Sequence, residues 1–109
     1  MAGFNESLGL VHQADGSVLL ETQPEHEVAP GTIHFAVLTT IAEVSAARAV
    51  GQPVVPAAID VQLMRRARPG RLVGVGRALK VGRSLAFADG EVRQEGEIVA
   101  RATVTFARL

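Results

Sequence analysis

The sequence contains no cysteine, tryptophan or tyrosine, and only four phenylalanines. Without cysteine the chain can form no disulfide, no thiolate metal site and no cysteine nucleophile. Eleven basic and eleven acidic residues give a formal net charge of zero. This balance gives no reason to expect nucleic acid or an acidic membrane surface as a partner, although the arginines can still gather locally.

Long apolar runs are also missing. No stretch approaches the ~18 apolar residues needed to cross a bilayer, and no basic and apolar leader precedes Gly3. We therefore expect a cytoplasmic protein without membrane contact. The content of 48% hydrophobic and 20% charged residues is that of an ordinary globular chain, and we expect one domain over residues 1–109.

One stretch is predicted to form a long helix, around which the rest of the chain is arranged. It runs from Pro30 to Gly51, with Thr32 as a candidate N-cap and Gly51 as the stop. Apolar residues occur nearly all round this helix, as expected for a helix that a sheet wraps. On one face of small residues, Glu43 is the only acid. A carboxylate there is costly unless it has a partner or a chemical role.

The segments on either side of this helix show strand patterns. Asp15-Gly16 separates two short apolar runs, which is typical of a hairpin. Residues 23–31 hold two prolines and a glycine, and we interpret them as an ordered loop. After the helix, strands are predicted over residues 58–64, with one face buried, and over 72–81, 85–93 and 97–108. Connections this short are expected to join antiparallel neighbours.

The strand predicted over residues 72–81 has almost no side chains on one face. That face carries Gly74, Gly76 and Ala78, and the larger residues share the other: Val73, Val75, Leu79 and Val81. A face without side chains lets a helix approach the strand backbone closely. The elements together predict an α+β fold in which a curved antiparallel sheet wraps one long helix.

Three motifs resemble those of the hotdog-fold acyl-CoA thioesterases, in particular the group similar to phenylacetyl-CoA and 4-hydroxybenzoyl-CoA thioesterases. The first, Gly31-Thr32-Ile33-His34-Phe35-Ala36, matches the Gly and His of a Gly-x-x-His-Gly-Gly helix start but not its last two glycines. Glu43 follows His34 by nine residues, the place of the family's catalytic acid. The second motif is the basic turn Arg65-Arg66-Ala67-Arg68-Pro69-Gly70-Arg71-Leu72, and the third is Gly82-Arg83-Ser84.

This resemblance covers roughly residues 8–107 and implies a hotdog fold with acyl-CoA thioesterase activity. It implies that the N–H of Phe35, beside His34, stabilises the thioester oxygen and that Glu43 is the base or nucleophile. Because family sites lie between subunits, it also implies a homodimer or homotetramer. It implies no cofactor, since coenzyme A is part of the substrate. The candidate substrate-binding residues are Thr39, Arg65, Arg66, Arg68, Arg83 and Ser84, of which the arginines would hold the phosphates of coenzyme A.

Each of these residues also has a simpler structural interpretation. Glu43 could form an ion pair with Arg48 or with an arginine of the sheet. His34 could be a hydrogen-bonding residue of the loop, and the arginines could form a solvated turn. His12 and His26 stand alone without metal-ligand spacing, so we expect no metal site.

Three function classes remain open. They are a thioesterase that acts on acyl-CoA, a non-catalytic acyl- or coenzyme A-binding module with the same fold, and a hotdog dehydratase or hydratase. Phe35 and Ala36, in place of two glycines, make the second class credible, and we rank the third class last. A panel of acyl-CoA thioesters with thiol detection separates the first class from the other two. The acyl group itself depends on the shape of a pocket across an interface.

Overall fold

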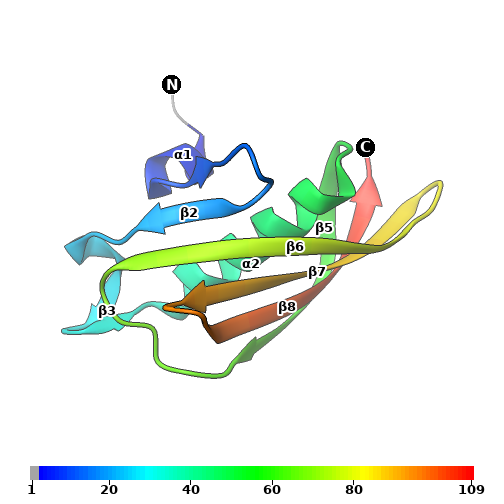
Figure 1. Ribbon diagram of the computed structural model, residues 1–109. Helices are drawn as coiled ribbons and strands as arrows, with labels where there is room; N and C mark the ends of the chain where they lie inside the picture. Colours follow the sequence, from blue (N-terminus) through cyan, green and yellow to red (C-terminus); the bar gives the residue numbers. More distant parts are fainter. Residues whose placement is uncertain (1–2) are drawn as a thin grey trace.

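In this computed structural model, which describes residues 3–109, a six-stranded antiparallel sheet curves around one long helix (Figure 1). The strand order is β1-β2-β6-β7-β8-β5. The elements before the long helix are α1 (Phe4–Leu8), β1 (Val11–His12), β2 (Val18–Glu21), the 3-10 helix η1 (Pro24–His26), β3 (Glu27–Ala29) and β4 (Thr32–Ile33). The remainder are α2 (Phe35–Val50), β5 (Val54–Leu63), β6 (Arg71–Val81), β7 (Leu85–Gln94) and β8 (Glu97–Arg108). This arrangement confirms the predicted α+β fold.

The long helix α2 ends where the sequence predicts but begins later. Gly51 is left-handed, with φ 73°, and its N–H donates to the Ala47 carbonyl at 3.3 Å. Glycine adopts this conformation without the strain that a Cβ would cause. The predicted N-cap at Thr32 is wrong, because Thr32 pairs with Ala29 in the small β3–β4 hairpin. His34 caps the helix instead.

The segment before α2 is more regular than the loop that its prolines predict. It contains η1 and the β3–β4 hairpin. The N–H of Gly31 donates to Oε1 of Glu27 at 2.7 Å, which closes the turn between β3 and β4. Upstream, the predicted hairpin at Asp15-Gly16 is confirmed as β1–β2, where Asp15 Oδ1 accepts the N–H of Ser17 at 2.9 Å.

Small residues in the sheet allow α2 to lie close to the strands. A side chain on Gly76 would overlap the carbonyl of Ser45, and one on Gly74 would meet the Ser45 side chain. Both contacts confirm that β6 presents an almost bare face to the helix. In β7, Gly90 makes the same kind of approach to the carbonyl of Ala42, which the sequence analysis did not single out.

A bulge between Ala78 and Lys80 changes which residues of β6 share a face. Beyond it, Val81 pairs with Ala86, which is buried on the helix side of β7. The prediction that Val81 lies on the same face as Val75 is therefore wrong, because one extra residue reverses the alternation of side chains.

The strand after the helix, β5, pairs with β8 and not with β6, which follows it in sequence. Residues 64–70, which we call the connector, cross the end of the sheet between the two (Figure 1). The connector is held there by backbone hydrogen bonds. Its Ala67 carbonyl accepts the N–H of Ile33 at 2.9 Å, and its Gly70 carbonyl accepts the N–H of Thr22 at 2.9 Å. The expectation that every short connection joins neighbouring strands is wrong here.

The core lies between α2 and the concave face of the sheet. Its largest fully buried apolar side chains are those of Phe106, Leu20, Ile41, Leu72, Val18, Val92 and Val104. The predicted buried face of β5 is only partly covered. Ile59 and Leu63 pair with the buried residues Val104 and Ala100, yet they are 42% and 54% exposed. They lie on the helix side of an edge strand that α2 does not fully cover.

Candidate functional site

The start of α2 leaves one backbone donor free. The N–H of Ala36 donates to Nδ1 of His34 at 2.9 Å, and the N–H of Val37 donates to the His34 carbonyl at 3.0 Å. Within the described residues, the N–H of Phe35 has no acceptor. Since Nδ1 of His34 accepts a hydrogen bond, the neutral ring carries its proton on Nε2. His34 is therefore a capping residue, as the simpler interpretation of it expects.

The peptide geometry sets the direction of the free donor. In a trans peptide the carbonyl and the following N–H point in opposite directions. Because the His34 carbonyl points into the helix, the Phe35 N–H points away from the helix start, where the dipole is positive. The N–H of His34 donates to the His26 carbonyl at 2.9 Å, and the rings of His34 and Phe35 stack with centroids 4.6 Å apart. The donor is thus fixed and can stabilise an oxygen that gains negative charge.

Glu43 lies half-buried on the outward side of α2. Burial raises the pKa of its carboxyl above the ordinary value. No cation among residues 3–109 forms an ion pair with it. Arg48, the partner that the structural interpretation offered, instead donates to the carbonyls of Ser17 at 3.2 Å and Gln13 at 2.7 Å. Glu43 is therefore an unpaired carboxylate in a partly apolar setting.

Two threonines lie on the same side of α2 as Glu43. Thr39, a predicted substrate contact one turn before Glu43, donates its hydroxyl to the Phe35 carbonyl at 2.9 Å. Thr40 donates to the Ala36 carbonyl at 2.8 Å. Both hydroxyl protons are used within the helix, so Thr39 can offer a ligand only an acceptor oxygen.

A cavity of about 420 Å³ lies beside the start of α2. Its walls come from the β3–β4 hairpin, the first turn of α2, the end of β5 and the connector. Four of its apolar wall residues are exposed: Val28, Phe35, Leu63 and Met64. Arg65 and Arg66 line it as well. The fold therefore gathers three residues that the sequence analysis singled out, Phe35, Arg65 and Arg66, around one cavity.

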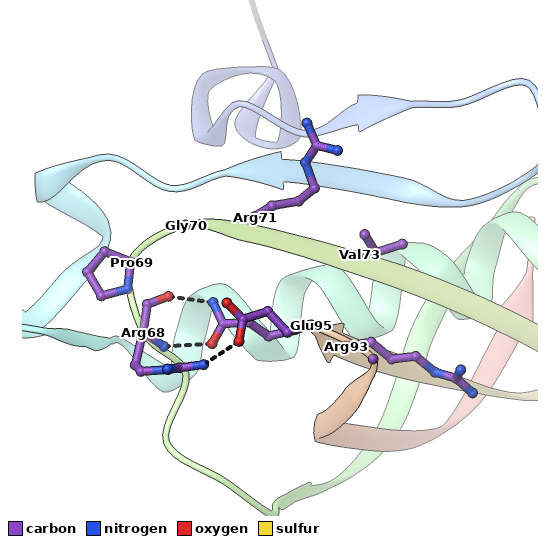
Figure 2. A pocket seen from close by; sticks show the side chains of 9 residues that line it. Arg68, Pro69, Gly70, Arg71, Val73, Arg93 and Glu95 are labelled. Carbon is purple, nitrogen blue, oxygen red and sulfur yellow. Dashed lines mark hydrogen bonds and ion pairs between the residues drawn. The ribbon is translucent and has the colours of Figure 1, made fainter.

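A second cavity, of about 560 Å³, lies between the connector and the turn from β7 to β8 (Figure 2). The predicted residue Arg68 lines it and pairs with Glu95 at 3.1 Å. The buried side chain of Gln94 accepts the Arg68 N–H at 3.0 Å and donates to the Arg68 carbonyl at 2.7 Å. Arg71 and Arg93 also line this cavity, and neither is among the candidate residues predicted from the sequence. In the sequence, Arg71 is recognisable only as the last arginine of the basic turn, and Arg93 lies in none of the three motifs.

Two of the predicted substrate-binding residues lie elsewhere. Arg83 and Ser84 follow the 11-residue strand β6 and so lie about 35 Å from the connector, at about 3.3 Å per residue. Within one chain the structure does not bring them to Arg65, Arg66 and Arg68. They could reach the same ligand only from a second subunit.

Other kinds of site find little support in the described part of the chain. Residues 3–109 hold no group of three or more histidine, cysteine, aspartate or glutamate side chains that could bind a metal ion. The buried His26 uses Nδ1 to accept the Gln23 N–H at 2.9 Å. None of the helices in that range has the length and apolar character to cross a bilayer.

Comparison with protein families gives one match, which spans most of the elements described above. Residues 23–107 match the family of the acyl-CoA thioesterase N-terminal domain. No curated protein matches the chain.

Several solved structures share the fold along nearly the whole chain. A mutant of the phenylacetic acid degradation protein PaaI from Thermus thermophilus is 30% identical, with a TM-score of 0.84 over 97% of this chain and 98% of its own. The conserved protein PA5202 from Pseudomonas aeruginosa is 25% identical, with a TM-score of 0.86 over 100% of this chain and 95% of its own. BH2602 from Bacillus halodurans, determined with CoA, is 20% identical, with a TM-score of 0.82 over 94% of this chain and 74% of its own.

Proposed function

The chain belongs to the acyl-CoA thioesterase family and has its hotdog fold, and we propose that Glu43 and the Phe35 N–H together hydrolyse an acyl-CoA thioester. The observation that carries this assignment is the Glu43 carboxylate, which is half-buried, has a raised pKa and lacks an ion-pair partner among residues 3–109. A carboxylate kept for stability would be paired, whereas a base is more effective as its pKa moves toward the working pH.

The chemistry needs a group that activates the attack and a donor at the carbonyl oxygen. With Glu43 as base, a water oxygen bonds to the thioester carbon while its proton passes to the carboxylate. The Phe35 N–H stabilises the resulting oxyanion. The carbon–sulfur bond then breaks, and the thiolate receives the proton from Glu43, which leaves a carboxylic acid and coenzyme A. With Glu43 as nucleophile, its carboxylate bonds to the thioester carbon and the carbon–sulfur bond breaks, which releases coenzyme A as a thiolate and leaves an anhydride on Glu43. Water then hydrolyses the anhydride to the carboxylic acid and the free Glu43 carboxylate, and the proton released passes to the thiolate.

One helix cannot supply both groups to one carbonyl. Glu43 follows Phe35 by eight residues in α2, so the two lie about 12 Å apart along the helix at about 1.5 Å per residue. A second copy of α2, antiparallel to the first, would bring the Phe35 N–H of one chain near the Glu43 carboxylate of the other. The proposed site is therefore composite and needs at least a homodimer.

The free edge of the sheet supports such a dimer. β5 pairs only with β8 and leaves its other edge open within the described chain. Ile59 and Leu63, on the helix side of β5, are large, apolar and exposed. Antiparallel pairing of two β5 strands would join the sheets and cover these side chains. A homotetramer would follow if two such dimers associated.

Coenzyme A is the proposed leaving group, held along the arginines of the connector, of which Arg68, at the end far from Phe35, would meet its phosphates. Arg65 and Arg68 each have one exposed acidic partner, Glu97 at 3.5 Å and Glu95 at 3.1 Å, while Arg66 has none among residues 3–109. Arginine suits phosphate because its guanidinium donates two parallel hydrogen bonds. Coenzyme A is present in the Bacillus halodurans neighbour, which supports this choice of ligand. The proposed setting of this reaction is the cytoplasm, as expected from the sequence.

The second candidate function is a non-catalytic module that binds an acyl group or coenzyme A. One observation favours it: Phe35 is 58% exposed and its side chain lies beside the free N–H, where the family has glycine. A ring there can restrict how closely a thioester approaches the backbone.

A panel of acyl-CoA thioesters with thiol detection tests the proposal. We expect turnover by the wild type and a loss of about 10²- to 10⁴-fold in kcat for Glu43→Gln, with the fold retained. Glu25→Gln, which neutralises an exposed acid, is the matched control and should keep full turnover. Turnover of Glu43→Gln near the wild-type rate would exclude Glu43 as the catalytic group. Binding of acyl-CoA without turnover would favour the binding module.

A further inference from the structure

Three cavities follow one another along the connector. The apolar cavity at the start of α2 shares Arg65 and Arg66 with a middle cavity of about 520 Å³. The middle cavity shares Arg68, Gln94 and Glu95 with the basic cavity of Figure 2. Because neighbouring cavities share wall residues, the three lie next to one another in a row from the start of α2 to the starts of β6 and β8. We call this row of cavities the connector groove.

The chemistry of the connector groove changes from one end to the other. At the α2 end the walls are mainly apolar, with Phe35 and Met64 among them. The middle is polar and contains both arginines and glutamates. At the far end three arginines and one acid line the wall: Arg68, Arg71, Arg93 and Glu95. Such a gradient fits a ligand with an apolar head, a polar arm and an anionic tail.

The arginines at the far end are available to a ligand. Arg71 pairs with Glu21 at 2.7 Å and Arg93 pairs with Glu91 at 2.8 Å, and the two arginine side chains are 67% and 49% exposed. In Figure 2 the two side chains lie on either side of Val73 and point away from each other. Exposed ion pairs contribute little to stability, so a phosphate can replace the carboxylates with stronger, bidentate hydrogen bonds.

The wall of the connector groove is held in place before any ligand binds. Gln94 is only 6% exposed, and its amide bonds to both the N–H and the carbonyl of Arg68. The N–H of Gly70 donates to the Thr22 hydroxyl at 2.7 Å. These bonds fix the connector to β7 and to the residue after β2, so less ordering is required when a long ligand lies along it.

We propose that the connector groove binds the coenzyme A part of the substrate, with Arg71 and Arg93 holding the phosphates of its adenosine 3′-phosphate 5′-diphosphate end. The inference rests on the proposed function and extends it to two residues outside the predicted set. The thioester lies at the Phe35 end, and the pantetheine arm follows the connector. The connector's seven residues span up to about 25 Å when extended, at about 3.5 Å per residue, a length that suits this arm.

Calorimetric binding to the full chain, without turnover, tests the assignment. The probes are coenzyme A, adenosine 3′,5′-bisphosphate and pantetheine, and the variants are Arg71→Gln and Arg93→Gln. We expect each variant to bind the two phosphate-bearing probes about tenfold more weakly and pantetheine unchanged. Lys80→Gln, which removes one positive charge near the other end of β6, is the matched control and should bind all three probes as the wild type does.

Different results test the binding of coenzyme A in the connector groove and the proposed thioesterase activity. If Arg93→Gln and Lys80→Gln weaken coenzyme A equally, or neither does, the far end of the groove is not the phosphate site. That result would stand whether or not the protein hydrolyses thioesters. An inactive wild type that binds coenzyme A through Arg93 would support the groove and exclude the thioesterase. If Arg71→Gln misfolds, Arg93→Gln alone decides, since Glu91 keeps Arg101 at 3.9 Å.

Discussion

Nδ1 of His34 accepts the N–H of Ala36 at 2.9 Å, and this bond separates the roles of two adjacent amides. The Ala36 amide is satisfied inside the protein, while the Phe35 amide before it remains free within the described residues. A serine or aspartate cap would satisfy the second amide of the helix in a similar way. His34 therefore satisfies the Ala36 amide and leaves the Phe35 N–H as the unpaired donor, which points away from the start of α2.

Replacing Phe35 with proline should remove this donor without disturbing the helix. Proline is favoured at the first helical position, and His34 already has the extended backbone, with ψ 138°, that a residue before proline adopts. We expect kcat to fall by about 10²- to 10³-fold with little change in melting temperature. Phe35→Ala, which loses the ring but keeps the N–H, is the control. Equal kcat values for the two variants would show that the amide has no catalytic role.

Mixing two inactive variants should restore activity if the site is composite. Glu43→Gln chains keep the Phe35 N–H, and Phe35→Pro chains keep the Glu43 carboxylate. A mixed dimer then has one complete site and one with neither group. After equal amounts are mixed and refolded together, about a quarter of the wild-type activity is expected, since half the dimers are mixed and half their sites are complete.

The oligomeric state must be measured on the same samples. Light scattering of the wild type at micromolar concentration should give a dimer or a tetramer. A monomer that still turns over substrate would exclude the composite site. Oligomers that form normally but regain no activity on mixing would exclude the composite site of Phe35 and Glu43.

The raised pKa of Glu43 predicts the sign of a stability change. Because burial disfavours the charged form, the folded protein binds this proton more tightly than the unfolded chain does. The ionised carboxylate thus destabilises the fold, and stability from this group is lost as pH rises through the folded-state pKa. Glu43→Gln should therefore be more stable than the wild type at pH 7 in urea unfolding. The difference should shrink as pH falls below the ordinary value of 4.5.

The raised pKa of Glu43 should also appear in the pH dependence of the reaction rate. The rate at limiting substrate should fall on the acid side with a midpoint above the ordinary pKa of a glutamate, because only the carboxylate can act as base or nucleophile. A wild type more stable than Glu43→Gln at pH 7 would mean that an unseen favourable contact holds the carboxylate. Glu25→Gln serves as the control in both measurements.

The parts of the fold that could be predicted from sequence are those that local signals define. Gly51 marks the end of α2 because left-handed backbone favours glycine. Gly74 and Gly76 mark the approach of the helix because no side chain fits beneath it. The bulge after Ala78 and the β5–β8 pairing have no comparable signal, since both depend on contacts between segments far apart in sequence.

The residues of the candidate site also differ in whether a local sequence signal identifies them. Glu43 could be found because an acid on a face of small residues conflicts with the local pattern. Arg71 and Arg93 could not, since they share a cavity only because the β6–β7 register places Val73 opposite Arg93. The sequence also singles out His34. It does not predict that His34 caps the helix, because it places the N-cap at Thr32, whereas α2 begins at Phe35.

The close approach of α2 to the sheet predicts that Gly90→Ala is destabilising. A methyl group there would overlap the Ala42 carbonyl, and neither backbone can move without separating the helix from β7. Overpacking of this kind costs about 1–3 kcal/mol, and we expect at least the upper part of that range in urea unfolding. Gly3→Ala, where nothing lies within 4 Å, is the control. Equal midpoints for the two variants would show that the helix can shift freely.

Phe35→Gly tests whether the ring beside the free amide limits the substrate. Phe35 is 58% exposed and lines the cavity at the start of α2, and its ring stacks on His34, so it occupies space that an acyl group or pantetheine arm would need. We expect slow hydrolysis of aromatic acyl-CoAs by the wild type, and a wider range of accepted acyl groups or a higher rate for Phe35→Gly. Phe35→Leu, which keeps an apolar side chain without the ring, is the control.

The outcomes for Phe35→Gly bear directly on the two candidate functions. Glycine at the first helical position weakens the helix slightly, about 1 kcal/mol relative to alanine, so melting temperatures must be compared before rates are interpreted. An inert wild type made active by this change would favour the binding module for the natural protein, because the machinery would then be present but blocked. An acyl profile that is the same in wild type and Phe35→Gly would show that the ring has no part in substrate selection.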